Sequence, residues 1–191
     1  MQNTRHIAVL YGSLCQRSCK RKIAALLEEL APPGLRLEVV EISRLSPYTG
    51  EQDRNPPAEW RVFRRQIRAS DGLLFLAPEN SRTVSGCLRN ALNIAAHDGG
   101  CNAWEGKPGA IVNVPANGLP FLRFPPSRGA TRRLRQALST LDVPVMQPPP
   151  ARDADVDALF DAAGKPANPA NRKFLTDFMQ AFGDWIRLCR H

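Results

Sequence analysis

The sequence predicts an α/β fold in which a parallel sheet of five strands carries helices on both faces, giving three layers. The first observation is that strand-like and helix-like hydrophobic segments alternate along the chain. The second is that two of the strand-like segments, Gly72–Ala77 and Ala110–Val114, are apolar almost without interruption. Continuous apolar strands are typical of a sheet that is buried on both faces, so helices should cover both sides.

Five short segments have the length and residue types of strands. They are Ile7–Tyr11, Leu35–Ile42, Gly72–Ala77, Ala110–Val114 and Val143–Met146. The fifth contains Pro144, which has no amide hydrogen to donate to a sheet. Helical spacing or helix-forming composition marks residues 19–31, 56–70, 86–97, 129–141 and 170–188. Because the two kinds of segment alternate, we expect the strands to run parallel and the helices to connect them.

Length and composition predict one soluble domain spanning residues 1–191. A chain of 191 residues is long enough for one hydrophobic core, and 43% hydrophobic with 23% charged residues is ordinary for a globular protein. No apolar stretch approaches the roughly 20 residues that a membrane-spanning helix needs. The five cysteines are odd in number and scattered, which favours reduced thiols over a disulfide framework. We therefore expect a cytoplasmic protein without membrane attachment.

The net charge of +8 favours anionic partners, and its distribution limits which ones. The cations are spread along the chain and are not interleaved with aromatic residues on one strand. The sequence contains no zinc-finger spacing and no RNA-recognition motif. Nucleic acid is therefore not an expected partner, whereas a phosphorylated cofactor or an acidic small molecule is compatible with this charge.

The segment after the first strand has the composition of a phosphate-binding turn. The apolar run Ile7–Tyr11 ends at Gly12, which permits a tight turn, and a helix start follows. Ser13 and Ser18 could donate hydrogen bonds where the free amides of that helix converge. The full dinucleotide fingerprint and the P-loop motif are both absent, so a plain strand-to-helix turn is the alternative.

Two long connections have no predicted helix or strand. Residues 43–58 are rich in Ser, Pro, Asn and Asp and are predicted to form a surface loop. Residues 115–128 contain Phe121 and Phe124, so this segment is either a lid over a site or a contact between subunits. In open parallel sheets, ligands bind at the carboxyl ends of the strands. The loops after Tyr11, Ala77 and Val114 are therefore the candidate site.

Three motifs in this chain occur together in one known family. Gly12-Ser13 with Ser18 and Arg21 matches G-S-x-R-x-x-S, and residues 70–75 (SDGLLF) match a-D-g-l-l-f. Residues 78–93 (PENSRTVSGCLRNALN) align without gaps on P-E-Y-N-x-S-x-P-G-x-L-K-N-A-I-D. Residues 159–165 and the helix that ends near Trp185 are similar to the closing segment. The chain thus resembles, over nearly its whole length, the NAD(P)H-dependent FMN reductases, a flavodoxin-like group with quinone, azo-dye and metal-oxyanion reductases.

The resemblance implies a flavodoxin-like fold and an FMN-dependent NAD(P)H oxidoreductase that passes electrons to a small acceptor such as a quinone. It places the FMN phosphate in the first loop and the isoalloxazine along the second, and it implies a homodimer or homotetramer. The cofactor-binding residues that it assigns are Gly12, Ser13, Cys15, Ser18, Cys19, Lys20, Pro78, Glu79, Asn80, Ser81, Arg82, Asn117 and Gly118. Hydride transfer needs little acid–base chemistry from the protein, so neither a catalytic side chain nor a metal is expected.

Some positions depart from the family pattern. Cys15 stands where arginine is usual, which removes a charge-assisted hydrogen bond worth about 1.5–3 kcal/mol. Lys20 or Arg21 could replace it, and Asn80-Ser81 replaces the usual Tyr-Asn pair. The alternative function is therefore a flavodoxin-fold binding protein with lost or altered flavin use, acting through a ligand or a protein partner. Retained flavin absorbance would distinguish the two.

Several side chains allow both a chemical and a structural interpretation. Cys15 and Cys19 are four residues apart and could form a redox pair or part of a metal site. Metal sites need three or four ligands, however, and buried cysteines commonly act as small apolar residues. His97 beside Asp98 could relay protons, but a surface histidine at a helix end is more common. Glu79 could act as a base near the flavin, or it could bind backbone amides.

Overall fold

Four parallel strands form the sheet in the computed structural model, which describes residues 4–11, 17–78, 84–114, 128–149, 159–161 and 165–189. The strand order is β2-β1-β3-β4. The strands are β1 (Arg5–Tyr11), β2 (Leu35–Val40), β3 (Gly72–Pro78) and β4 (Gly109–Val114). Each of these strands was predicted from its apolar run, and the parallel pairing is confirmed.

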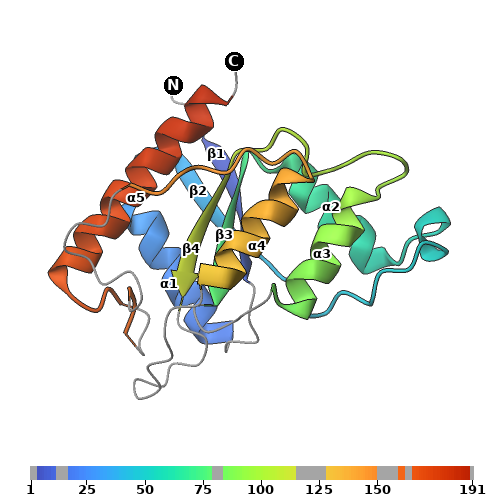
Figure 1. Cartoon of the computed structure of the whole chain (residues 1–191), viewed down its shortest axis with the longest axis horizontal. Coiled ribbons are helices and arrows are strands. Elements are labelled where there is room, and N and C mark those ends of the chain that lie inside the picture. Colours follow the sequence, from blue (N-terminus) through green and yellow to red (C-terminus); the bar gives the residue numbers. More distant parts are fainter. Residues whose placement is uncertain are drawn as a thin grey trace.

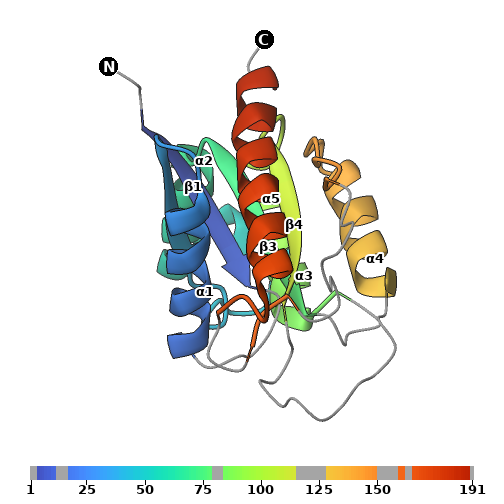
Figure 2. The same cartoon turned by 90° about the vertical axis from the view of Figure 1, so that its left-hand side faces the viewer.

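Helices cover both faces of the sheet, as predicted (Figures 1 and 2). One face carries α1 (Arg17–Leu30) and α5 (Pro169–Leu188). The other carries α2 (Ala58–Ala69), α3 (Gly86–Ala96) and α4 (Arg128–Ser139). A short 3₁₀ helix, η1 (Gln52–Arg54), precedes α2. None of the helices in the described part of the chain has both the length and the apolar character needed to span a membrane.

The prediction of a fifth strand was wrong, since the sheet of the described residues has four. The segment Val143–Met146 does reach the edge of β4, where Val145 and Gly109 form a single parallel bridge. The Gly109 amide donates to the Pro144 carbonyl at 2.9 Å, and the Met146 amide donates to the Gly109 carbonyl at 2.8 Å. Pro144 has no amide hydrogen, so the segment contributes one bridge where a strand would contribute a ladder.

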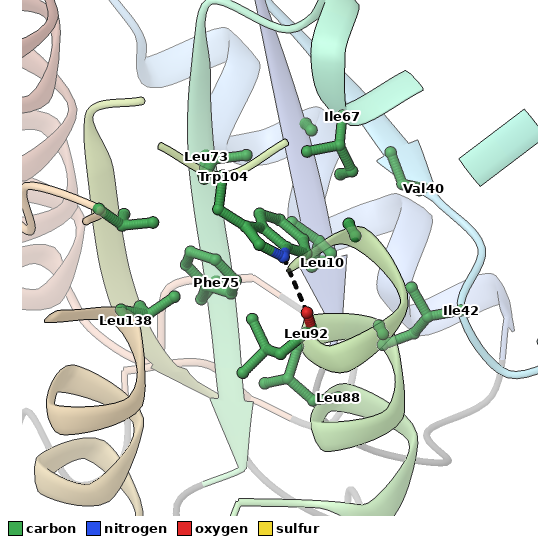
Figure 3. Close-up of a cluster of buried hydrophobic side chains, with 14 of the residues drawn as sticks. Leu10, Val40, Ile42, Ile67, Leu73, Phe75, Leu88, Leu92, Trp104 and Leu138 are labelled. Carbon is green, nitrogen blue, oxygen red and sulfur yellow. Dashed lines mark hydrogen bonds between the residues drawn. The ribbon is translucent and has the colours of Figure 1, made fainter. Parts of the chain in front are cut away.

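The sheet is buried on both faces because alternate side chains of each strand point to opposite sides. On β1, Ile7 and Val9 pack in the cluster beneath α1 and α5, while Leu10 packs in the cluster beneath α2, α3 and α4. Figure 3 shows the second cluster, in which the Trp104 indole Nε1 donates to the Leu92 carbonyl at 3.0 Å. This double burial explains why the strands read as nearly continuous apolar runs.

The segment between β2 and α2 lies mostly at the surface, as predicted for residues 43–58, but it is firmly attached to its neighbours. The Asn90 side chain on α3 accepts from the Tyr48 amide at 2.7 Å and donates to the Ser46 carbonyl at 2.9 Å. The Trp60 indole on α2 donates to the same carbonyl at 3.2 Å. Side chains of two helices therefore hold this long connection in place.

Candidate functional site

Three neighbouring strands end at the same edge of the sheet. Tyr11 of β1 lies beside Leu76 of β3, and Pro78, the last residue of β3, lies beside Val114, the last residue of β4. Between β1 and β3 the chain order reverses, because β2 lies on one side of β1 and β3 on the other. In open α/β sheets such a reversal creates the crevice in which ligands bind. The structure thus brings the ends of the three predicted site strands together.

Three of the helices that begin at this edge each follow one of these strands (Figure 1). They are α1, α3 and α4, and none of them has an acidic residue in its first turn. By contrast, α2 carries Glu59 in its first turn. Free amides and the helix dipole favour an anion at a helix start. The absence of acidic residues from these first turns is therefore compatible with an anion such as the FMN phosphate.

Two helix caps fix the backbone at this edge. Ser85 is the N-cap of α3, and its side chain accepts from the Leu88 amide at 3.3 Å. Asn168 is the N-cap of α5, which begins at the same end of the sheet (Figure 2), and accepts from the Asn171 amide at 2.7 Å. Asn171 itself is fully buried there. We did not single out these residues from the sequence, although Asn168 before Pro169 is a helix-start signature that could have revealed them.

The predicted cofactor residues fall into two groups. The structure places Ser18, Cys19 and Lys20 in the first turn of α1 and Pro78 at the end of β3. The others lie outside the described residues: Gly12, Ser13, Cys15, Glu79, Asn80, Ser81, Arg82, Asn117 and Gly118. Phe121 and Phe124 lie outside them as well. The assignment of these residues to FMN remains a prediction from the family motifs.

A buried cation anchors the long connection between β2 and α2. Arg64 on α2 is 3% exposed, and its Nε donates to the Ile94 carbonyl at 2.9 Å. Its guanidinium also donates to the Asp53 carboxylate and to the His97 carbonyl. The Nη1 atom lies 3.6 Å from Asp98 Oδ1. One side chain thus joins α2, the end of α3 and the connection that contains η1.

His97 lies at the end of α3, and its ring contacts are with protein groups. Its Nδ1 is 3.0 Å from the Asn93 carbonyl oxygen, and its ring stacks on Tyr48 at 5.2 Å between centroids. Burial raises the pKa of Tyr48, the Asp53 carboxylate raises it further, and Arg64 lowers it. These contacts fit the structural interpretation of His97, in which the ring completes the packing at the helix end.

Comparisons with known proteins agree with this architecture. The model of the NADPH-dependent FMN reductase family matches residues 5–151. A quinone reductase of Pseudomonas putida is 40% identical over 191 residues, covering 100% of this chain and 99% of that protein. A 2-hydroxy-1,4-benzoquinone reductase of a Burkholderia species is 33% identical over 181 residues, covering 95% and 96%.

Among solved structures, the flavoenzyme NAD(P)H:(acceptor) oxidoreductase FerB from Paracoccus denitrificans superimposes with a TM-score of 0.77. It is 26% identical, and the match covers 97% of this chain and 98% of that one. The fold is therefore that of a flavodoxin-like flavoenzyme, as the motifs implied. The family match covers most of the chain, and the chain belongs to the NADPH-dependent FMN reductase family.

Proposed function

We propose that this protein transfers two electrons from NAD(P)H through FMN to a quinone, at the edge where β1, β3 and β4 end. The family supplies the reaction class, an NAD(P)H-dependent FMN reductase. The main support for this location of the FMN phosphate is that α1, α3 and α4 all begin at that edge and none has an acidic residue in its first turn. The quinone as acceptor is supported by the two quinone reductases among the relatives.

The first turn of α1 and the loop before it hold the phosphate in this proposal. Backbone amides at the start of α1 would donate to the phosphate oxygens, and the Ser13 and Ser18 hydroxyls would add two further donors. Lys20 would supply the positive charge that the family usually provides at the position of Cys15. A dianion would gain from the amides, the hydroxyls and the cation together, and Ser18 and Lys20 lie in the first turn of α1.

The loop after β3 would hold the polar edge of the flavin ring. Pro78 ends β3 and Ser85 caps the start of α3, so the structure fixes both ends of the connection that contains residues 79–82. Bound FMN would supply the redox chemistry, a two-electron transfer from NAD(P)H to the quinone, and the quinone would take up two protons to become a hydroquinone. One proton comes with the hydride and one from solvent, so no side chain has to act as an acid or a base.

The proposal extends to the state of the protein in the cell. The protein acts as one domain over residues 1–191, in the cytoplasm, and as a homodimer or homotetramer. The single sheet to which all the described helices are packed supports one domain. The odd number of scattered cysteines supports a reducing compartment, and the apolar Phe121–Phe124 segment supports a contact between subunits. Gel filtration combined with light scattering would give the number of subunits.

Kinetics with the FMN-loaded protein test the proposed reaction. We expect NAD(P)H to bleach the visible flavin absorbance without oxygen, and 1,4-benzoquinone to restore it. Steady-state rates should give parallel double-reciprocal lines, because donor and acceptor use the same face in turn. Failure of both NADH and NADPH to bleach the bound flavin would contradict the proposal.

A pair of serine variants tests where the FMN phosphate binds. Ser18→Ala removes a proposed phosphate donor from the first turn of α1 and should weaken FMN binding about tenfold. Ser139→Ala, at the exposed end of α4, is the matched control and should leave FMN binding unchanged. Equal FMN affinity in the two variants would place the phosphate elsewhere.

A further inference from the structure

A groove of about 350 Å³ lies between α2 and the adjoining strands β1 and β2. Its apolar floor is formed by Ala8 and Val40, which are 3% and 4% exposed. Val62 at its rim is 47% exposed, which is unusual for a large apolar side chain in this structure. The groove flanks the first half of β1, whereas Tyr11 ends that strand at the proposed redox edge. The two sites are therefore separate.

Positive charge borders the groove on the α2 side. Arg61, Arg65 and Arg68 follow one another at helical spacing and line a second depression together with Ala69. This depression is continuous with the groove, because Arg65 and Ala69 line both. Arg68 pairs with a carboxylate at the end of α3, whereas Arg61 and Arg65 form no ion pair with any described residue.

We propose that this groove binds an aromatic carboxylate or sulfonate of one or two rings. The ring system would lie on the floor and against Val62, and the anion would take a bidentate hydrogen bond from the Arg65 guanidinium. The volume is at the lower end of the range for small-molecule sites, which suits a body of this size. Removing the ring and the floor from water would provide affinity, and Arg65 would select the charge.

The opposite wall determines how the ligand is oriented. Glu38 on β2 lines the groove across from α2, so a carboxylate placed on that side would be repelled. The anionic end must therefore point toward Arg65 and Arg61. A second copy of this chain suits the surface less well, because the arginine row on α2 would meet like charge in a symmetric pair. This site adds a ligand to the proposed redox function and does not depend on it.

Calorimetric titration of the FMN-loaded protein with 2-naphthoate tests the proposal. The uncharged 2-naphthamide has the same rings and serves as the matched ligand. We expect one naphthoate per chain, bound about tenfold more tightly than the amide, because only the anion gains a charge-assisted hydrogen bond. Absence of binding, or equal binding of the two ligands, would overturn the proposal. So would competition between naphthoate and FMN, which would place the naphthoate in the redox site.

Two charge-removing variants should change the affinity in opposite directions. Arg65→Gln should weaken naphthoate binding about tenfold, and Glu38→Gln should strengthen it about twofold. Both side chains are exposed, so FMN content and quinone reductase activity should remain those of the wild type. Arg132→Gln, on the exposed side of α4, is the control and should have no effect. A change in the same direction in both groove variants would contradict the proposed orientation of the ligand.

Discussion

Replacing Arg64 with methionine should destabilise this protein more than replacing any exposed arginine. The side chain is 3% exposed and holds together two carboxylates and two backbone carbonyls. Methionine fills a similar volume but donates no hydrogen bond. The substitution therefore leaves Asp53, Asp98 and the carbonyls of Ile94 and His97 without this partner.

The magnitude follows from the burial of the partners. Breaking a fully buried ion pair by removing one member typically costs about 3–5 kcal/mol. The side chains of Asp53 and Asp98 are 21% and 15% exposed, so water can partly replace the lost guanidinium. We therefore expect the free energy of unfolding to fall by about 3 kcal/mol, a large share of the 5–15 kcal/mol typical of a domain.

Urea denaturation, followed by the fluorescence of the buried Trp60 and Trp104, measures this change. Arg61→Met is the matched control, because Arg61 is an exposed residue on the same helix without an ion pair to any described residue. The control should change the free energy by less than about 0.5 kcal/mol. A loss below about 1 kcal/mol in Arg64→Met would refute the reasoning that the buried guanidinium anchors this region.

Three further substitutions test other parts of the fold. Gly109→Ala would place a Cβ atom 2.9 Å from Val143 Cγ1, so thermal or chemical unfolding should show a loss of about 1–3 kcal/mol. Lys107→Met removes two hydrogen bonds, at 3.0 and 2.8 Å, to carbonyls at the end of α2, and should cost about 1–2 kcal/mol; an unchanged unfolding midpoint would contradict this. Folding raises the pKa of Tyr48 above its usual value of 10.0, so the unfolded chain loses this proton first as pH rises. Stability should therefore decline above about pH 10 in the wild type and decline less in Tyr48→Phe, as urea titrations at neutral and alkaline pH would show.

The secondary structure could be predicted because its determinants are local. Apolar runs such as Gly72–Ala77 and helical spacing such as that of α2 are read from a few neighbouring residues, and the structure places both as expected. The prediction of a fifth strand was wrong for an equally local reason. The apolar residues around Pro144 satisfy the strand pattern, but the missing amide limits pairing to one bridge at Gly109.

The cluster of partners around Arg64 could not be predicted, because it depends on contacts between distant parts of the chain. Asp53 and Asp98 look like ordinary surface residues in the sequence. The packing of α2 against α3 brings Asp98 to Arg64, and Asp53 comes from η1. The candidate site could be predicted only in part. The composition after Tyr11 predicts a turn. The convergence of three helix starts could not be predicted, because it depends on the register of β1, β3 and β4.

The most direct test of the proposed phosphate site is a titration of the flavin-free protein with FMN and with riboflavin, followed by quenching of flavin fluorescence. The two ligands share the isoalloxazine and differ in the phosphate. We expect FMN to bind about 100-fold more tightly, the effect of roughly two charge-assisted hydrogen bonds at the start of α1. Equal affinities would show that the edge does not hold a phosphate, and failure of FMN to bind would contradict flavin-dependent electron transfer by this chain.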